Sequence, residues 1–251
     1  MKNLVKEYSV KGLFEKDINK LLKITNNDLA MFRRYAQRRL FGEPIEYIQK
    51  HTIFLNRKFI IDYKTYIPTK ETESLINKVL ENINNNSILL DVGTGCGALG
   101  ISISLKKPNV KVYGCDISPD ALKIARLNSK KHKVNIKFFE SFYVDDLDIP
   151  MPTHIIADLP WGNVNYLLKG NDFNRYLHGP KIAFFHPLGI LHSYIELFES
   201  IKRKGWHPKV YFESGVIPEE EVSKIIPKGK KWKYIKFKQN YSITIVYMWS
   251  K

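Results

Sequence analysis

Asp158, Leu159, Pro160 and Trp161 stand together directly after an apolar run, and three of them bring distinct chemical properties. A carboxylate such as that of Asp158 accepts hydrogen bonds, a proline stiffens a turn and removes a backbone N–H, and an indole can stack on a flat ligand. Together these groups suit a planar NH2 group, whose hydrogens go to the carboxylate while its face rests on the ring. Charge is thereby drawn onto the nitrogen, which is aimed at an electrophile. We predict that the four residues form a catalytic loop.

A glycine-rich turn upstream has the features of a cofactor site. The apolar run that ends at Asp91 and Val92 continues into a turn with Gly93, Gly95 and Gly97, and glycines allow a sharp turn and let a ligand approach the backbone. A second apolar run ends in Asp116, 23 residues after Gly93, a spacing at which a carboxylate can accept both ribose hydroxyls. The two signals together predict a cofactor that contains a nucleoside.

The catalytic loop and the cofactor turn must be held in place by helices and strands. The order of apolar and helical segments along the chain predicts an α/β fold. Residues 71–83 have helical spacing, and apolar strands then alternate with helices, which is typical of a parallel sheet. We expect strands near residues 87–92, 110–116, 135–139, 153–158, 182–186, 208–213 and 242–248. Open α/β sheets bind ligands at the carboxyl edge of their strands, so the two sets should lie together there.

The turn reads DxGxGxG, and the dinucleotide fingerprint GxGxxG has no acid in front of its glycines. It therefore resembles motif I of the class I methyltransferases, which bind S-adenosylmethionine; an NAD-type cofactor is the main alternative. The resemblance implies a Rossmann-like fold with a seven-stranded sheet. Carried over by position, the residues that would bind the cofactor are Asp91, Gly93, Thr94, Gly95, Gly97, Asp116, Ile117 and Phe142.

The adenine pocket follows the family pattern less closely. Phe142 stands where the family usually places an acid or an amide near the adenine amine. Glu140, Asp145 and Asp146 are the substitutes that the sequence offers, and it does not rank them.

A wider resemblance covers roughly residues 30–250. Its most specific stretches are 38–48, 66–75 and 89–100, and they are similar to the HemK/PrmC family of protein-(glutamine-N5) methyltransferases, which modify the glutamine of the Gly-Gly-Gln loop in peptide-chain release factors. The resemblance implies a methyltransferase that uses S-adenosylmethionine and acts on a protein, with a release factor and translation termination as the expected context.

The catalytic loop departs from the family in a way that leaves the acceptor open. Family members have Asn-Pro-Pro-Tyr, and an asparagine can donate as well as accept, whereas an ionised Asp158 only accepts. An aspartate suits the exocyclic amine of a nucleobase, so methylation of RNA or DNA is an alternative. Because Phe142 and Leu159 also deviate, a third possibility is a basic binding module that keeps the fold without turnover.

The N-terminal part has its own organisation. Apolar residues at helical spacing predict two or three helices in the first forty residues, the last one capped within residues 25–28 and ending at Phe41 and Gly42. Residues 53–63 predict a hairpin around Asn56 and Arg57. The expected division is a helical substrate-recognition domain at 1–45, a β-hairpin linker at 46–66 and the methyltransferase domain at 67–251.

Composition and charge limit where the protein could act and what it could bind. No run approaches the roughly 20 apolar residues that span a bilayer, so we expect a soluble, cytoplasmic monomer with no membrane contact. Cys96 and Cys115 form no CxxC pair, and we expect no metal site. The net charge of +15 lies at the ends, because residues 1–60 carry 13 basic and 6 acidic residues and residues 200–251 carry 12 and 4. These ends could contact RNA or the ribosome, or form a solvated lysine surface.

The histidines need no catalytic task in this scheme, because the nitrogen attacks before or as it loses its proton. His154 precedes the catalytic loop on a strand and should be structural. His178 and His186 could line the mouth of the substrate site.

Overall fold

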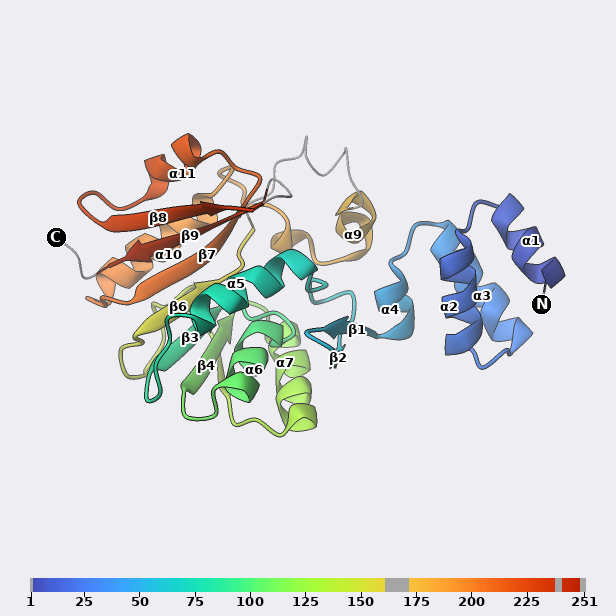
Figure 1. The fold of residues 1–251 in the computed structure, drawn as a ribbon, viewed down its shortest axis with the longest axis horizontal. Coiled ribbons are helices and arrows are strands. Elements are labelled where there is room, and N and C mark those ends of the chain that lie inside the picture. The colour runs from blue at the N-terminus through green and yellow to red at the C-terminus, as the bar shows by residue number, and fades with distance from the viewer. Residues whose placement is uncertain (1, 161–171, 238–240, 249–251) are drawn as a thin grey trace.

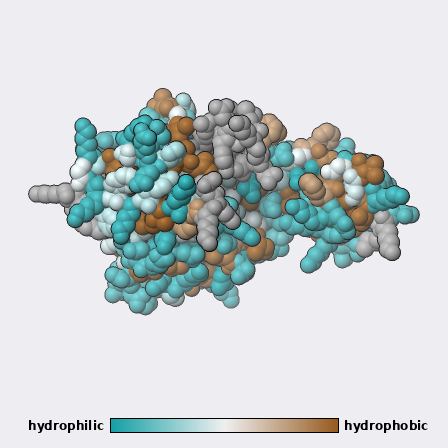
Figure 2. Space-filling model, turned by 45° about the horizontal axis from the view of Figure 1, so that its top comes forward, coloured by the Kyte–Doolittle hydropathy of each residue, from teal (hydrophilic) through white to brown (hydrophobic). Residues whose placement is uncertain are grey.

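The structure is a computed structural model that describes residues 2–160, 172–237 and 241–248. It has two lobes, a small helical one at the N-terminus and a larger one built on a sheet (Figure 1). Figure 2 shows the same lobes in space filling, with apolar side chains interspersed among polar ones on both. Among the described residues, no helix is both long and apolar enough to span a bilayer.

The helical lobe consists of α1 (Lys2–Val10), α2 (Glu15–Ile24), α3 (Leu29–Leu40) and α4 (Ile45–Gln49). Asp28 caps α3, because its side chain accepts a hydrogen bond from the Met31 amide over 2.9 Å. The helix ends at Leu40 with Phe41 as its C-cap, so the predicted start and end are confirmed. The lobe has a core of its own, which contains Ile18, Leu21 and Phe32.

The hairpin is present, with a turn one residue earlier than expected. Strands β1 (His51–Phe54) and β2 (Arg57–Ile60) pair antiparallel, and Leu55 and Asn56 turn the chain with φ of 46° and 59°. A two-residue turn with both central residues left-handed matches the twist of the paired strands. This places the turn at Leu55 and Asn56, whereas the sequence suggested Asn56 and Arg57.

Helix α4 joins the two lobes. Ile45 and Ile48 are buried in the core of the helical lobe, whereas Tyr47 is buried in the core of the larger lobe and donates its hydroxyl to the Thr65 carbonyl over 2.9 Å. The predicted boundary between residues 45 and 46 falls at the beginning of this helix, and the division into domains stays a prediction.

The predicted α/β fold with a seven-stranded sheet is confirmed. The order is β5-β4-β3-β6-β7-β9-β8, parallel except for β9, which pairs antiparallel with both β7 and β8. The strands are β3 (Ile88–Val92), β4 (Lys111–Asp116), β5 (Lys137–Glu140), β6 (His154–Ala157), β7 (Lys209–Gly215), β8 (Lys231–Lys236) and β9 (Ser242–Tyr247).

Helices cover both faces of this sheet (Figure 1). Helices α5 (Lys70–Leu80), α6 (Ala98–Lys106) and α7 (Pro119–His132) pack on one face and share one apolar core. Helices α10 (His192–Arg203) and α11 (Glu219–Ile225) pack on the other face and form the second core. The short helix α9 (Asp172–His178) lies toward the helical lobe, where His178 contacts the Phe41 carbonyl through Nε2 at 3.3 Å.

One expected strand is absent, and one strand of the sheet was not predicted. Residues 182–186 are not a strand, because Lys181–Ala183 forms a 3-10 turn and Phe184 packs edge-on against the rings of Tyr66 and Tyr176. The seventh strand is instead β8, a lysine-rich segment for which the sequence left open a contact with phosphates or a solvated surface.

Candidate functional site

A cavity of about 730 Å³ lies at the carboxyl edge of the sheet, as expected for an open α/β fold. Its walls come from the ends of β3 to β7, from the segment before α5 and from residues 180–187. Eight of the predicted site residues line it: Gly93, Gly95, Asp116, Ile117, Phe142, Asp158, Leu159 and Pro160. The structure thus brings the predicted cofactor turn and catalytic loop together.

Asp91 is behind the cavity wall and holds the glycine turn. Its Oδ2 accepts hydrogen bonds from the Thr94 hydroxyl at 2.6 Å and from the Gly100 amide at 3.0 Å. Burial raises the pKa of this carboxyl to about 7. Asp91 and Thr94 therefore shape the turn from behind, and they do not line the cavity themselves.

The glycines of the turn are required by its backbone. Gly93 has φ of +70°, and a Cβ there would lie 2.6 Å from Cδ2 of Leu159. Gly97 has φ of +84°, and its Cβ would lie 2.9 Å from Cδ1 of Ile101. The first clash would be with the catalytic loop and the second with α6, so these two glycines let three segments pack closely.

The side chain of Asn128 connects the glycine turn to the hairpin. Its side chain is fully buried, and its Nδ2 donates to the Cys96 carbonyl at 2.9 Å and to the Ile60 carbonyl at 2.8 Å. Its Oδ1 accepts from the Ile60 amide at 2.7 Å. One amide therefore ties the hairpin to the glycine turn, and sequence reasoning did not single it out.

Asp116 has the geometry of a ribose acceptor. Its Oδ2 accepts from the Gly95 amide at 2.8 Å and its Oδ1 from the Ser118 amide at 2.9 Å. Burial raises its pKa in spite of these bonds. Each carboxylate oxygen retains a further lone pair, and the residue lines the cavity, so both oxygens can accept hydroxyl hydrogens.

The region next to β5 contains a polar group that the sequence reasoning missed. Phe142 lies at the cavity mouth and is 49% exposed. The Ser141 hydroxyl beside it is buried, lines the cavity and has no hydrogen-bond partner among the described residues. Glu140, Asp145 and Asp146 do not line the cavity, and Asp145 forms an ion pair with an arginine of α10. Ser141 is thus the candidate contact for an adenine amine.

The catalytic loop is anchored on both sides. Thr72 of α5 donates to Oδ2 of Asp158 at 3.1 Å. Tyr194 of α10 accepts from the Leu159 amide at 3.0 Å, and Ser193 donates to the Pro160 carbonyl at 3.1 Å. Trp161 lies outside the described residues.

Asp158 has a second carboxyl beside it that the sequence did not reveal as a site residue. Glu213 of β7 is buried, lines the same cavity and lies close enough to Asp158 that each carboxyl affects the pKa of the other. Burial raises the pKa of Asp158 to about 6. Burial, followed by the charge of Asp158, raises the pKa of Glu213 well above its ordinary value.

The histidines fall in three different places. His154 is structural as expected, because it contacts the Thr153 hydroxyl at 2.8 Å and stacks on Tyr211, and burial lowers its pKa to about 4. His186 lines the cavity, and His178 does not.

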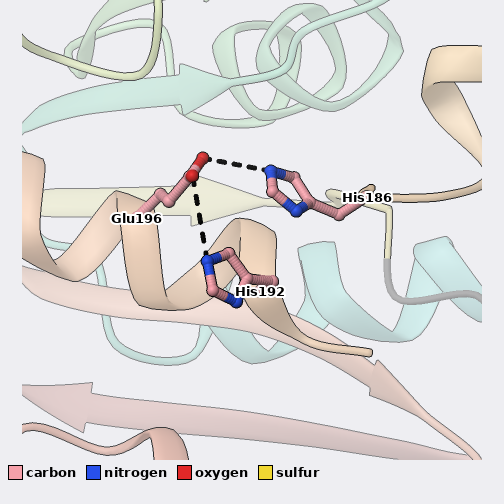
Figure 3. Close-up of side chains that lie close together, drawn as sticks. All are labelled: His186, His192 and Glu196. Atoms are coloured by element: carbon pink, nitrogen blue, oxygen red, sulfur yellow. Dashed lines mark hydrogen bonds and ion pairs between the residues drawn. The ribbon is translucent and has the colours of Figure 1, made fainter. Parts of the chain in front are cut away.

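His186 also belongs to a cluster with His192 and Glu196 that has metal-ligating atoms (Figure 3). The Glu196 carboxylate contacts Nε2 of His186 at 3.2 Å and Nε2 of His192 at 3.9 Å. However, the Leu188 amide donates to Nδ1 of His186, so the neutral ring carries its proton on Nε2, the atom that a metal would need. The cluster is therefore better described as a set of polar contacts that holds His186, at the cavity wall, to Glu196 of α10.

Comparison with known proteins places the chain in a sequence family. Residues 70–157 match the model of the methyltransferase small domain. A release factor glutamine methyltransferase of Staphylococcus aureus is 38% identical over 204 residues, which cover 79% of this chain and 70% of that protein. One of Buchnera aphidicola is 36% identical over 174 residues, which cover 68% of this chain and 59% of that protein. These matches confirm the resemblance inferred from the motifs, although the second spans less than two thirds of the relative's length.

Solved structures agree with the fold. A methyltransferase from Pyrococcus furiosus superposes with a TM-score of 0.55 at 16% identity, over 86% of this chain and 98% of that one. A ribosomal protein L11 methylase from Lactobacillus delbrueckii subsp. bulgaricus gives 0.54 at 14% identity, over 74% and 83%. At these identities the likeness concerns the fold alone.

Proposed function

This chain belongs to the family of the release factor glutamine methyltransferases, and on that basis we propose that it transfers a methyl group from S-adenosylmethionine to the side-chain amide nitrogen of a glutamine in a protein. The proposed substrate is a peptide-chain release factor. One observation carries the proposal: the Asp158 carboxyl and the glycine turn line the same cavity. An acceptor for amide hydrogens thus lies beside the predicted cofactor site.

The residues of the cavity fit S-adenosylmethionine. Asp116 has free lone pairs for the ribose hydroxyls, and the buried Ser141 hydroxyl lacks a partner among the described residues. A Cβ at Gly95 would meet nothing closer than 4.0 Å, so this side of the turn leaves room for a ligand. When bound, the cofactor supplies a methyl group on a positively charged sulfur.

The chain's own residues then position the acceptor nitrogen. The ionised Asp158 accepts one N–H of the substrate amide, which increases electron density on the nitrogen. Thr72 and Ser193 hold the loop that carries this carboxylate, so the nitrogen is oriented before reaction. Pro160 has no amide hydrogen to compete for the carboxylate.

Asp158 also favours a second candidate, the methylation of an exocyclic amine of a nucleobase in RNA or DNA. A nucleobase amine needs only an acceptor for its hydrogens, which a carboxylate provides. The basic character of both chain ends would suit a polyanion.

The test is transfer of radiolabelled methyl groups from S-adenosylmethionine to purified release factor, to release factor with its Gly-Gly-Gln glutamine replaced by alanine, to tRNA and rRNA, and to DNA. We expect label on the unmodified release factor alone. Label on nucleic acid alone would contradict the proposal and support the second candidate. Absence of label everywhere, with calorimetry showing that the cofactor binds, would support a binding module without turnover.

A further inference from the structure

The two carboxyl groups at the site are neighbours because of the sheet register. Strands β6 and β7 are parallel neighbours, and Ala157 is paired with Phe212. Asp158 directly follows β6, Glu213 is the next residue of β7, and both line the cavity. Adjacent strands are about 4.8 Å apart, which brings the two side chains to the same point at the carboxyl edge.

The groups that most affect the pKa of this pair are hydroxyls and a further acid. Glu71 and Thr72 approach from α5, Tyr194 from α10, and Tyr241 from the residue before β9. Lysines 64 and 181 also line the cavity, but Lys64 is paired with Asp120, and Lys181 donates to backbone carbonyls of α9. Arg175 and Lys70 line a second cavity that Glu213 also borders, but no cation is among the groups that most affect the pKa of either carboxyl.

One oxygen of the pair supports this interpretation independently. Oε2 of Glu213 is buried and has no hydrogen-bond partner among the described residues, although a buried ionised carboxylate needs several. Two ionised carboxylates in contact at a buried site are strongly unfavourable, so that one of the pair keeps its proton. The raised pKa values of both groups agree with this geometry.

We propose that Asp158 and Glu213 share one proton, and that Glu213 is a positioning and specificity-determining residue for a carboxamide acceptor. This inference rests on the proposed function. An ionised Asp158 accepts an N–H of the carboxamide, and the protonated Glu213 donates to its carbonyl oxygen. The pair thus offers the acceptor and the donor that one side-chain amide would offer, which is what a lone aspartate at position 158 lacks.

The shared proton is tested first, without any substrate. Infrared difference spectra of the full-length protein near neutral pH should contain carbonyl absorption of neutral carboxyl groups; the part that comes from Glu213 should disappear in the Glu213→Gln variant, whereas the part that comes from Asp91, with its pKa of about 7, should remain. The exposed Glu140→Gln variant is the matched control and should retain all of this absorption. If the absorption is unchanged in Glu213→Gln, the two carboxyl groups do not share a proton and the inference is wrong.

The role toward substrate is tested by kinetics on release factor. In the Glu213→Gln variant, the new side-chain amide would keep its N–H pointed at Asp158 and leave the substrate carbonyl without a donor, so kcat/KM should fall about 10- to 100-fold. Binding of S-adenosylmethionine by calorimetry and the thermal unfolding midpoint should be nearly unchanged. Adding Asp158→Asn should recover part of the lost kcat/KM, because asparagine accepts and donates.

The outcomes separate this inference from the proposed function. If Glu213→Gln methylates release factor as fast as the unaltered protein, Glu213 has no role in recognising the acceptor. If Asp158→Asn lowers the activity of Glu213→Gln further, the pair does not imitate an amide. If the unaltered protein labels only nucleic acid, the proposed function is wrong, and so is the proposal that the acceptor is a carboxamide. The infrared spectra then decide by themselves whether Asp158 and Glu213 share a proton.

Discussion

The Thr72 hydroxyl donates to Oδ2 of Asp158 over 3.1 Å, which links the first turn of α5 to the end of β6. This bond favours the ionised form of Asp158 and lowers its pKa against the opposing effect of burial. A residue more than eighty positions away in the sequence thereby controls the charge at the site.

Replacing Thr72 by valine should raise the pKa of Asp158. Valine has a similar shape and no hydroxyl, so the carboxylate loses a hydrogen bond, worth about 1.5 to 3 kcal/mol when the acceptor is charged. The pH at which kcat/KM reaches half of its maximum should move upward. Thr72→Ser retains the hydroxyl and should behave like the unaltered protein; equal profiles for valine and serine would refute this role.

Removing the carboxyl of Asp158 should stop turnover while cofactor binding persists. In Asp158→Ala no group accepts the amide hydrogens, and we expect kcat to fall more than about 100-fold. Calorimetry should still detect S-adenosylmethionine, because the turn and Asp116 are intact. Normal turnover by this variant would show that Asp158 is not the acceptor.

Asp116→Ala should weaken cofactor binding by a few kcal/mol at most, as expected for the loss of charge-assisted hydrogen bonds. The Gly95 and Ser118 amides lose their acceptor in the same variant, so a small loss of stability should accompany the effect. Calorimetric titration gives the dissociation constant. Asp148→Ala, at an exposed position, is the control and should bind normally.

Gly93→Ala and Gly95→Ala should affect the protein differently. Both positions have positive φ, which costs alanine about 1 kcal/mol, but only the Cβ at position 93 meets Leu159 at 2.6 Å. Urea unfolding should therefore show the larger loss of stability in Gly93→Ala. In Gly95→Ala the loss of cofactor affinity should exceed the loss of stability, and equal unfolding curves would contradict the packing argument.

The contribution of Asp91 and Asp158 to stability should decrease between about pH 4 and pH 7, whereas His154, with its lowered pKa of about 4, acts in the opposite direction. Burial raises the pKa of Asp91 to about 7 and of Asp158 to about 6, whereas an aspartate in the unfolded chain titrates near 3.9. Across this window these two groups bind more protons in the folded state than in the unfolded state, so their contribution to the free energy of unfolding falls as pH rises, by at most about 1.4 kcal/mol per pH unit for each group. Asp91→Asn should make the slope shallower in urea unfolding at several pH values.

The sequence identified the parts of the site that belong to one continuous segment. Strand, turn and acid follow one another at Asp91, Gly93 and Asp116, and the catalytic loop comes directly after β6. The spacing within such local patterns is set by the chain itself, so eight of the predicted residues line one cavity and Asp91 lies directly behind its wall. The function of Asp91 as a support behind the turn also follows from its place inside the strand.

What the sequence did not reveal depends on contacts between distant segments. Glu213 becomes a site residue only through the pairing of β6 with β7, and Thr72 only through the approach of α5. No local pattern marks either residue. Both lie in stretches that resemble the family, which was the signal available for finding them.

The misplaced strand has a different cause. In β8 exposed Lys231 and Lys233 alternate with Trp232 and Tyr234, which pack against the core. Lysines protect an edge strand from pairing with another chain. Because this strand is rich in lysine, its alternation of exposed and packed side chains was not recognised as a strand pattern. Within residues 182–186, Phe184 is buried against other aromatic rings, and the apolar content of this segment alone does not distinguish such a turn from a strand.

Helix α4 contributes side chains to two cores at once, Ile45 and Ile48 to one and Tyr47 to the other. Bending between the lobes would have to expose apolar surface on one side of this single helix. The lobe for which we propose substrate recognition is therefore held at a set distance from Asp158, and so would be any partner bound to it. Shortening the N-terminal part would change which portion of that partner arrives at the carboxylate.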